Sequence, residues 1–147
     1  MLAPPLVEYY QIDDYRKHYE SMYCVSPIVT FDSIPVYFRK DKFEHSFFES
    51  SKRDGVKDVF SPERARRIEW IKATLQHKDA ELYVGWDKAK KRYDRNHRVA
   101  VVYNDFVVII KISRKINGSL KAEFVTAYVA DNSIEKIRSA PRWTGIK

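Results

Sequence analysis

Residues 106–129 constrain the fold most, because they read as two β-strands joined by a tight turn. Two runs rich in β-branched and aromatic side chains flank the pair Asn117 and Gly118. An Asn-Gly pair between such runs is the strongest short-range signal for a β-hairpin. We therefore expect an antiparallel hairpin here, with the rest of the sheet built around it.

The second strand of this hairpin divides into two faces, because alternate residues of a strand point the same way. One face is apolar and should be core; it carries Val125, Ala127 and Val129. The other face combines an apolar ring with two hydroxyls; it carries Phe124, Thr126 and Tyr128. A purely structural strand does not need these hydroxyls, so we expect the function to lie on the second face.

Two earlier segments extend the hairpin into a sheet. Residues 81–86 and 98–103 have strand character, and residues 106–114 and 119–129 complete an antiparallel meander. Both faces of the central strands are apolar, so the sheet should be covered on much of both sides. The predicted fold class is α+β, with N-terminal helices packed on a four-stranded antiparallel β-sheet.

The length favours a single domain spanning residues 1–147, with enough chain for a sizeable core. We expect four parts within it. They are an extended arm at 1–8, a mainly helical part at 13–76, the antiparallel sheet at 80–130, and a C-terminal helix and tail at 131–147.

The clearest helix is predicted for residues 61–76. Ser61 is the expected N-cap, and Pro62 fits the first helical position, where its missing N–H costs nothing. On a helical wheel, Arg64 falls within the apolar stripe and Arg67 at its edge. A guanidinium that points toward a core must be paired or must reach a cleft, because burying it unpaired costs too much. Arg64 is therefore either a structural residue with its head group in water or a functional one, and the sequence leaves both open.

The net charge of +7 and the pI near 9.4 favour a polyanionic partner, with nucleic acid first and an anionic membrane surface second. The single cysteine, Cys24, excludes an internal disulfide and fits a reducing compartment. The N-terminus lacks the features of a signal peptide, and no run approaches the ~20 apolar residues of a spanning helix. We expect a cytoplasmic protein with no membrane partner.

The sequence carries no Gly-rich phosphate loop, no Cys–His metal spacing and no His-Glu-x-x-His motif. We therefore expect no cofactor and no metal. Histidine, arginine, lysine and hydroxyl residues remain, and they suffice for cleavage of RNA by its own 2′-hydroxyl. In that reaction a base removes the 2′ proton, a cation stabilises the phosphate and an acid protonates the leaving 5′ oxygen. Histidine suits either proton transfer.

Three segments also carry a resemblance to a known family: Phe43-x-His45-x-Phe47-Phe48-Glu49, then Phe60-Ser61-Pro62-Glu63-Arg64-Ala65-Arg66-Arg67-Ile68-x-Trp70-Ile71, then Phe124-Val125-Thr126-Ala127-Tyr128. They resemble phage and mobile-element members of a ribonuclease superfamily. That superfamily groups barnase, EndoU, the tRNA-cleaving colicin domains and RelE toxins, and its fold is known as BECR. The resemblance covers residues 43–143 and implies a helical N-terminal part packed on a four-stranded antiparallel sheet.

The resemblance implies a metal-independent endoribonuclease, such as a toxin that cleaves tRNA or another cellular RNA and leaves a 2′,3′-cyclic phosphate. It implies that His45 is a general base or acid, and that Arg64 and Arg67 are phosphate-stabilising cations. Thr126 and Tyr128 would position phosphate or sugar. The implied partners are RNA and, for a toxin, a cognate antitoxin or immunity protein. Without the resemblance, a histidine among aromatics and a threonine in a strand are ordinary structural residues.

A basic segment at residues 87–98 is the candidate RNA-binding surface. Its cations would act as non-specific phosphate ligands: Lys88, Lys90, Lys91, Arg92, Arg95 and Arg98. Trp86 and Tyr93 would stack a base, as is common for single-stranded RNA. A solvated charged loop explains the same pattern, and the sequence does not separate the two.

Two other functions remain compatible with the sequence. One is a non-catalytic RNA- or protein-binding module on the same fold. The other is an enzyme that acts on something other than nucleic acid, and a deep apolar pocket away from the basic surface would favour it.

Overall fold

The computed structural model describes residues 3–52, 56–87, 89–94 and 97–144. Its largest element is a six-stranded sheet with the order β1-β2-β10-β9-β8-β5. These strands are β1 (Ile28–Val29), β2 (Pro35–Tyr37), β10 (Leu120–Val129), β9 (Phe106–Arg114), β8 (Arg98–Tyr103) and β5 (Glu81–Val84). Two small two-stranded sheets are also present. One pairs β3 (Phe48–Glu49) with β4 (Val59–Phe60), and the other pairs β6 (Trp86–Asp87) with β7 (Arg92–Tyr93).

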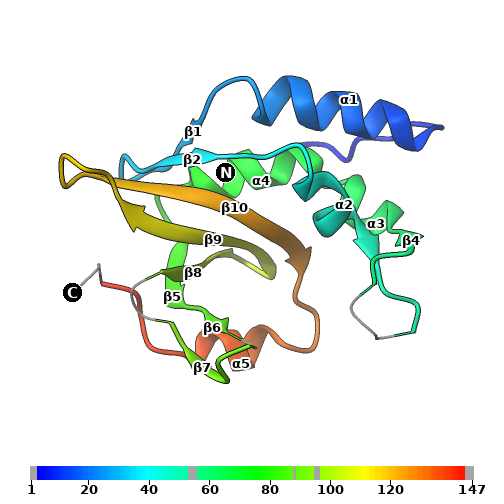
Figure 1. Ribbon diagram of the computed structural model, residues 1–147. Helices are drawn as coiled ribbons and strands as arrows, with labels where there is room; N and C mark the ends of the chain where they lie inside the picture. Colours follow the sequence, from blue (N-terminus) through cyan, green and yellow to red (C-terminus); the bar gives the residue numbers. More distant parts are fainter. Residues whose placement is uncertain (1–2, 53–55, 88, 95–96, 145–147) are drawn as a thin grey trace.

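The helices divide between the two sides of the sheet (Figure 1). Buried side chains of four helices join one large cluster: α1 (Ile12–Tyr23), α2 (Lys42–Phe47), α3 (Pro62–Ala65) and α4 (Ile68–Leu75). The short helix α5 (Ile134–Arg138) packs on a second, smaller cluster on the opposite face. The expectation of an α+β fold with cover on both faces is therefore confirmed.

The prediction of a four-stranded antiparallel sheet was wrong. The four expected strands, β5, β8, β9 and β10, are adjacent and antiparallel. Two more strands join them, and β2 lies parallel to β10, so the sheet is mixed. The segment at 13–76 consequently contains β1 to β4 as well as helices. The strands β1, β3 and β4 have two residues each, which is too short for an alternation that a sequence pattern could reveal.

The predicted hairpin is confirmed at its turn. Gly118 has a φ of 89°, in the left-handed region that glycine adopts without strain. Its N–H donates to the carbonyl of Lys115 at 2.9 Å. The Asn117 side chain accepts from the Ser119 N–H at 3.0 Å, which fixes the turn from the other side.

The predicted helix at 61–76 is two helices, α3 and α4. The cap is as expected, because Ser61 accepts from the Arg64 N–H at 3.4 Å and Pro62 follows at the first helical position. The helix ends after Ala65, and Arg67 has φ −96° and ψ 23°, outside the helical region. The break rotates α4 relative to α3. Trp70 of α4 packs against the core, with its ring 5.6 Å from that of Phe106.

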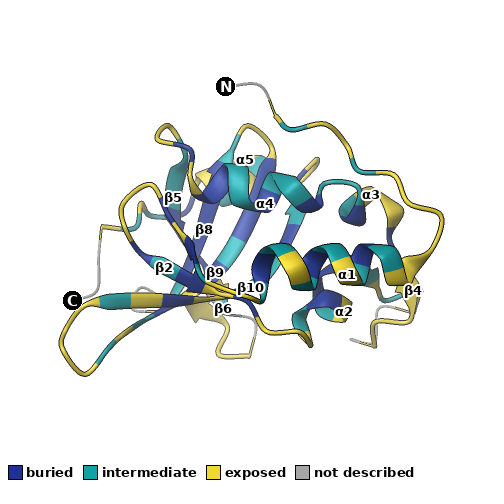
Figure 2. Cartoon of the chain, turned by 90° about the horizontal axis from the view of Figure 1, so that it is seen from above, coloured by how far each residue is buried: buried dark blue, intermediate teal, exposed yellow. Residues whose placement is uncertain are grey.

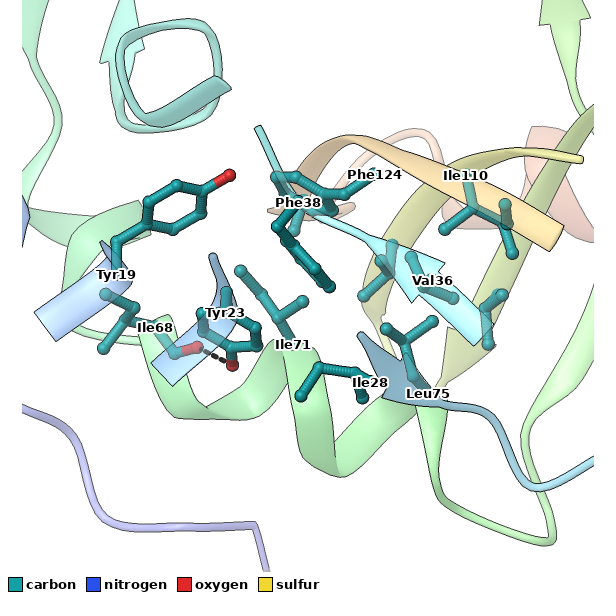
Figure 3. Close-up of a cluster of buried hydrophobic side chains, with 14 of the residues drawn as sticks. Tyr19, Tyr23, Ile28, Val36, Phe38, Ile68, Ile71, Leu75, Ile110 and Phe124 are labelled. Atoms are coloured by element: carbon teal, nitrogen blue, oxygen red, sulfur yellow. Dashed lines mark hydrogen bonds between the residues drawn. The ribbon is translucent and has the colours of Figure 1, made fainter. Parts of the chain in front are cut away.

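An aromatic core holds the helices on the sheet. Phe38, just after β2, stacks on Phe124 of β10 with ring centroids 4.7 Å apart and planes inclined by 24°. Tyr19 and Tyr23 of α1 complete this group (Figure 3). In Figure 2 the buried residues of α1 recur along the helix between exposed ones, as an amphipathic pattern requires. Offset and edge-on ring pairs of this kind contribute about 0.5–1.5 kcal/mol each beyond burial.

Tyr23 also makes a polar contact inside this core. Its hydroxyl donates to the Ile68 carbonyl at 2.5 Å, the bond drawn in Figure 3, and accepts from the Lys72 N–H at 3.1 Å. These two backbone groups would normally bond to each other across one turn of α4. The Tyr23 hydroxyl therefore lies within the helix ladder and ties α1 to the start of α4.

We expect Tyr23→Phe to lower the free energy of unfolding by about 1–2 kcal/mol, because a buried hydroxyl that satisfies two backbone groups is lost. Urea denaturation measures this value. Tyr37→Phe is the matched control, since Tyr37 is 41% exposed. Equal stabilities of the two variants would contradict a structural role for the Tyr23 hydroxyl.

The C-terminal segment closes the outer edge of β5. The Pro141 carbonyl accepts from the Val84 N–H at 2.8 Å, and the Leu82 carbonyl accepts from the Trp143 N–H at 3.0 Å. An open strand edge is a site for unwanted pairing, and this segment removes it at β5. On the opposite face of the sheet, Lys111 and Glu123 are exposed, whereas Val102 and Val107 are buried in the cluster with α5.

Candidate active site

A β-bulge at Val125 decides which side chains of β10 reach the candidate site. Phe124 pairs with Ile110, but the next pair along β10 is Thr126 with Ile109, so Val125 is an extra residue. A bulge shifts the alternation of a strand by one position. Phe124 consequently faces the helices and their core, whereas Thr126 and Tyr128 face the opposite side.

The expectation that Phe124, Thr126 and Tyr128 share one face of β10 was wrong. The bulge interrupts the alternation of side chains between Phe124 and Thr126, so Phe124 lies on the other face. The separation of Thr126 and Tyr128 from the core residues Ala127 and Val129 stands, since the latter two pack in the helix-side cluster. Thr126 pairs across the strands with Ile109, and Tyr128 pairs with Val107.

Helix α2 places His45 beside β10. Phe43 and Phe47 are buried in the main core, and the buried Ser46 donates its hydroxyl to the Val125 carbonyl at 3.4 Å. These contacts fix one side of the helix on the bulge, and His45 remains half-buried on its flank. In the described part of the chain, His45 is the one histidine whose ring has no hydrogen-bond partner; the others contact Tyr9 and Glu69 (His18), Asp79 (His77) and Asp94 (His97).

Arg64 lies between α2 and the end of β10. Its Nη1 donates to the Ser46 carbonyl at 3.4 Å, and its Nε lies 3.4 Å from a carboxylate oxygen of Glu49. Its guanidinium carbon is 5.8 Å from the centre of the Tyr128 ring. The side chain is 24% exposed, so the guanidinium is partly desolvated but accessible. Arg64 therefore reaches the edge of the sheet, as its position in the apolar stripe suggested.

The electrostatics at His45 favour its neutral form. Burial lowers the pKa of His45, and the positive charges of Lys42, Lys57, Arg64 and Arg98 lower it further. Burial raises the pKa of Tyr128, and the Arg64 charge opposes that effect. At neutral pH the site therefore offers a neutral imidazole and a protonated phenol next to guanidinium charge. A neutral imidazole can accept a proton, and a phenol can donate a hydrogen bond.

Arg67, the second predicted cation, is not part of this group of contacts. The break between α3 and α4 directs it to its own helix, where Nη1 donates to the Glu63 carbonyl at 2.6 Å and pairs with the Glu63 carboxylate at 3.3 Å. Its guanidinium lies 5.0 Å from the Trp70 ring. We find no contact between Arg67 and His45 or Tyr128 among the described residues.

The predicted RNA-binding segment is a short hairpin and not a loop. Strands β6 and β7 pair Trp86 with Tyr93, and the centroids of the two rings lie 5.2 Å apart in an edge-to-face arrangement. Trp86 is 49% exposed and Tyr93 is 39% exposed. Lys90, Lys91 and Arg92 are exposed at the turn, where Lys91 has a φ of 52°. Lys88 and Arg95 lie outside the described residues. Arg98 begins β8, next to the base of the hairpin.

Two residues near His45 were missed from the sequence, Ser46 and Glu49. Ser46 connects the bulge to Arg64, and Glu49 is the carboxylate partner of that arginine. Glu49 follows His45 by one helical turn, a spacing that signals proximity only if the segment is helical there. A buried serine in a short aromatic segment gives no such signal.

None of the helices in the described residues is long and apolar enough to span a membrane. The same residues contain no group of three or more histidine, cysteine, aspartate or glutamate side chains placed to hold a metal ion. The small cavity among Leu75, Val99 and Trp143 is enclosed by the core and lies apart from His45.

A scan against protein-family models finds no match to this chain, and no match is found among curated proteins or solved structures. The arguments about function therefore rest on the site itself.

The pKa of His45 gives a prediction for the pH dependence of stability. Its value in the folded chain lies below the ordinary 6.5. Between the two values the unfolded chain binds more protons at this ring, so the free energy of unfolding rises with pH through that window. We expect His45→Gln to flatten this rise, and an NMR titration of the imidazole to give a midpoint below 6.5. A midpoint at or above 6.5 would contradict the description of the site.

Proposed function

We propose that the protein is a metal-independent endoribonuclease that cleaves RNA by attack of the 2′-hydroxyl and leaves a 2′,3′-cyclic phosphate. The observation that carries the proposal is the half-buried imidazole of His45, which has no hydrogen-bond partner in the described chain and whose pKa is lowered by burial and by nearby lysine and arginine charges. A general base must be unprotonated at the working pH and works best when its pKa lies near that pH. The same surroundings would attract and orient a phosphodiester.

Each residue has a distinct role in this reaction. His45 takes the proton from the 2′-hydroxyl while the 2′ oxygen forms a bond to phosphorus and the bond from phosphorus to the 5′ oxygen breaks. Arg64 stabilises the negative charge that grows on the phosphate oxygens. The leaving 5′ oxygen takes its proton from Tyr128 or from water. The Oγ1 of Thr126 is buried and has no partner among the described residues, so we assign Thr126 no direct contact with the RNA.

Glu49 sets the starting state of Arg64. In the absence of RNA its carboxylate lies 3.4 Å from Nε of that arginine. A phosphate that approaches Arg64 would compete with Glu49, which is 53% exposed and can turn toward water. The ion pair therefore holds the arginine in place without blocking it, because exposed pairs contribute about 1 kcal/mol or less.

We expect purified protein to cleave total RNA in the presence of EDTA and to leave fragments that end in 2′,3′-cyclic phosphate. His45→Gln should slow cleavage by about 10²- to 10⁴-fold, the usual contribution of a general base. His18→Gln is the matched control, since His18 contacts Tyr9 and Glu69 and none of the site residues. Absence of cleavage by the wild type, or equal cleavage by His45→Gln, would refute the nuclease.

A non-catalytic RNA-binding module is the second candidate, and the exposed hairpin of β6 and β7 favours it. Its two aromatic rings and its basic turn are a common combination for holding single-stranded RNA. This surface would serve binding whether or not His45 is catalytic. An endoribonuclease and a non-catalytic RNA-binding protein would therefore use the same binding surface, and they differ in whether His45 of α2 acts as a base.

We expect replacement of Lys90, Lys91 and Arg92 together by glutamine to reduce the slope of log affinity against log salt concentration. For single-stranded RNA the slope changes by about 0.7 for each phosphate contact, so the triple variant should lose roughly 2. Titration by fluorescence anisotropy at several salt concentrations measures it. The control replaces Lys17, Lys72 and Lys78, which lie on or next to α1 and α4. An equal loss in the control would show that only net charge matters.

A further inference from the structure

Gly85 leaves room for the side chain of Arg98. Gly85 follows β5, and its N–H donates to the Arg98 carbonyl at 2.9 Å, so the two residues face each other across neighbouring strands. A Cβ atom at Gly85 would overlap Cγ of Arg98 and would lie 2.9 Å from Cδ and 3.1 Å from Cβ. The clash involves the base of the side chain and not its flexible end. Any larger residue at position 85 would therefore force Arg98 into another rotamer.

The backbone around Gly85 fixes this arrangement. The Gly85 carbonyl accepts from the Asp94 N–H at 2.9 Å, and the Asp94 carbonyl accepts from the Arg98 N–H at 3.1 Å. These bonds close the base of the hairpin formed by β6 and β7. The stem of Arg98 therefore lies against Gly85 at the base of this hairpin.

Arg98 differs from most arginines of the chain because no carboxylate pairs with it among the described residues. Most of the other described arginines form an ion pair: Arg16, Arg39, Arg64, Arg66, Arg67, Arg138 and Arg142. Arg98 is half-buried, and its charge acts on Asp87 and on His45 without a direct contact. A partly desolvated guanidinium without an anion is suited to bind one.

The strand register places Arg98 on the α5 side of the sheet, in a row whose other members, Lys111 and Glu123, are exposed. Arg98 pairs with Lys111 of β9, and Lys111 pairs with Glu123 of β10. The adjacent row on the same face is Ala100, Ile109 and Thr126, followed by Val102, Val107 and Tyr128. The face that carries Thr126 and Tyr128 at one end therefore carries Arg98 at the other.

We propose that Arg98 is a specific phosphate-binding residue of the His45 site and that Gly85 is the residue that positions it. The inference rests on the proposed function, because it takes the ligand to be the sugar–phosphate backbone of RNA. Arg64 then binds that backbone at the end of β10, and Arg98 binds another phosphate of the same strand of RNA at the base of the β6–β7 hairpin. The hairpin of β6 and β7 lies next to the second position and would contact the adjoining nucleotide.

A purely structural role for Gly85 predicts a different effect of Gly85→Ala on RNA binding. If Gly85 only allowed close packing at the base of the hairpin, Gly85→Ala would reduce stability and leave binding unchanged. If Gly85 acts through the Arg98 guanidinium, Gly85→Ala should weaken binding in the presence of Arg98 and have no effect on binding in its absence.

A double-mutant cycle with Gly85→Ala and Arg98→Gln tests this. The ligand is a short single-stranded RNA with 2′-O-methyl groups, which its own 2′ oxygens cannot cleave, and anisotropy reports binding. We expect Arg98→Gln to weaken binding roughly tenfold, Gly85→Ala to act similarly, and the double variant to match Arg98→Gln within about twofold. Arg39→Gln is the control, because Arg39 is an exposed arginine that pairs with Asp41 and lies outside the proposed binding surface.

The second readout is the His45 titration, which does not require activity. Loss or displacement of the Arg98 charge should raise the pKa of His45 in both single variants, since that charge lowers it in the wild type. Thermal unfolding identifies variants that have lost the fold, and Arg98→Lys, which keeps the charge, should partly restore binding.

The possible results distinguish the proposed phosphate site at Arg98 from the proposed ribonuclease activity. Multiplying effects in the double variant, or equal effects of Arg98→Gln and Arg39→Gln, would overturn the inference. RNA cleavage by the wild type that neither variant alters would also overturn it, while the nuclease would stand. Binding that follows the cycle in a protein that never cleaves RNA would retain the Arg98 site and refute the nuclease.

Discussion

The bulge at Val125 is the constraint on which the site depends. Before it, β10 directs Phe124 into the core, where the ring stacks on Phe38 and joins β2 to the sheet. After it, the same strand directs Thr126 and Tyr128 to the opposite face. Without the extra residue, one of these functions would be lost, because alternation cannot place Phe124 and Tyr128 on opposite faces. A single strand thus serves both the core and the candidate chemistry.

The bulge also holds the helices that supply the other side chains. The Val125 carbonyl accepts from the Ser46 hydroxyl, and the Ser46 carbonyl accepts from Arg64. This short chain of hydrogen bonds connects β10, α2 and α3, so a shift in any one of them would move His45 or Arg64. Side chains that act together require this kind of support, since binding and catalysis are sensitive to displacements of about 1 Å.

Local chemistry determined what could be predicted from the sequence. Asn117 and Gly118 identify the hairpin and Ser61 identifies a helix start, because each signal depends on neighbouring residues alone. The sequence gives no signal of the bulge, because the residues around Val125 alternate as in a regular strand. Regular alternation therefore predicted the wrong face of β10 for Phe124. His45, Arg64 and Tyr128 were recognisable by residue type, but their proximity depends on tertiary packing. The prediction for Arg67 assumed a continuous helix, whereas the break between α3 and α4 turns its side chain to Glu63. The role proposed for Gly85 depends on a neighbour on another strand.

The distribution of ion pairs explains where the positive charge can act. A net charge of +7 is a property of the whole chain, but most described arginines on the helices and the C-terminal segment have a carboxylate partner. Arg92 and Arg98 have none among the described residues; Arg92 lies in β7, and Arg98 begins β8 at the base of the β6–β7 hairpin. The positive charge of these two arginines is therefore not offset by a described carboxylate, and it can act on an anion that approaches the hairpin.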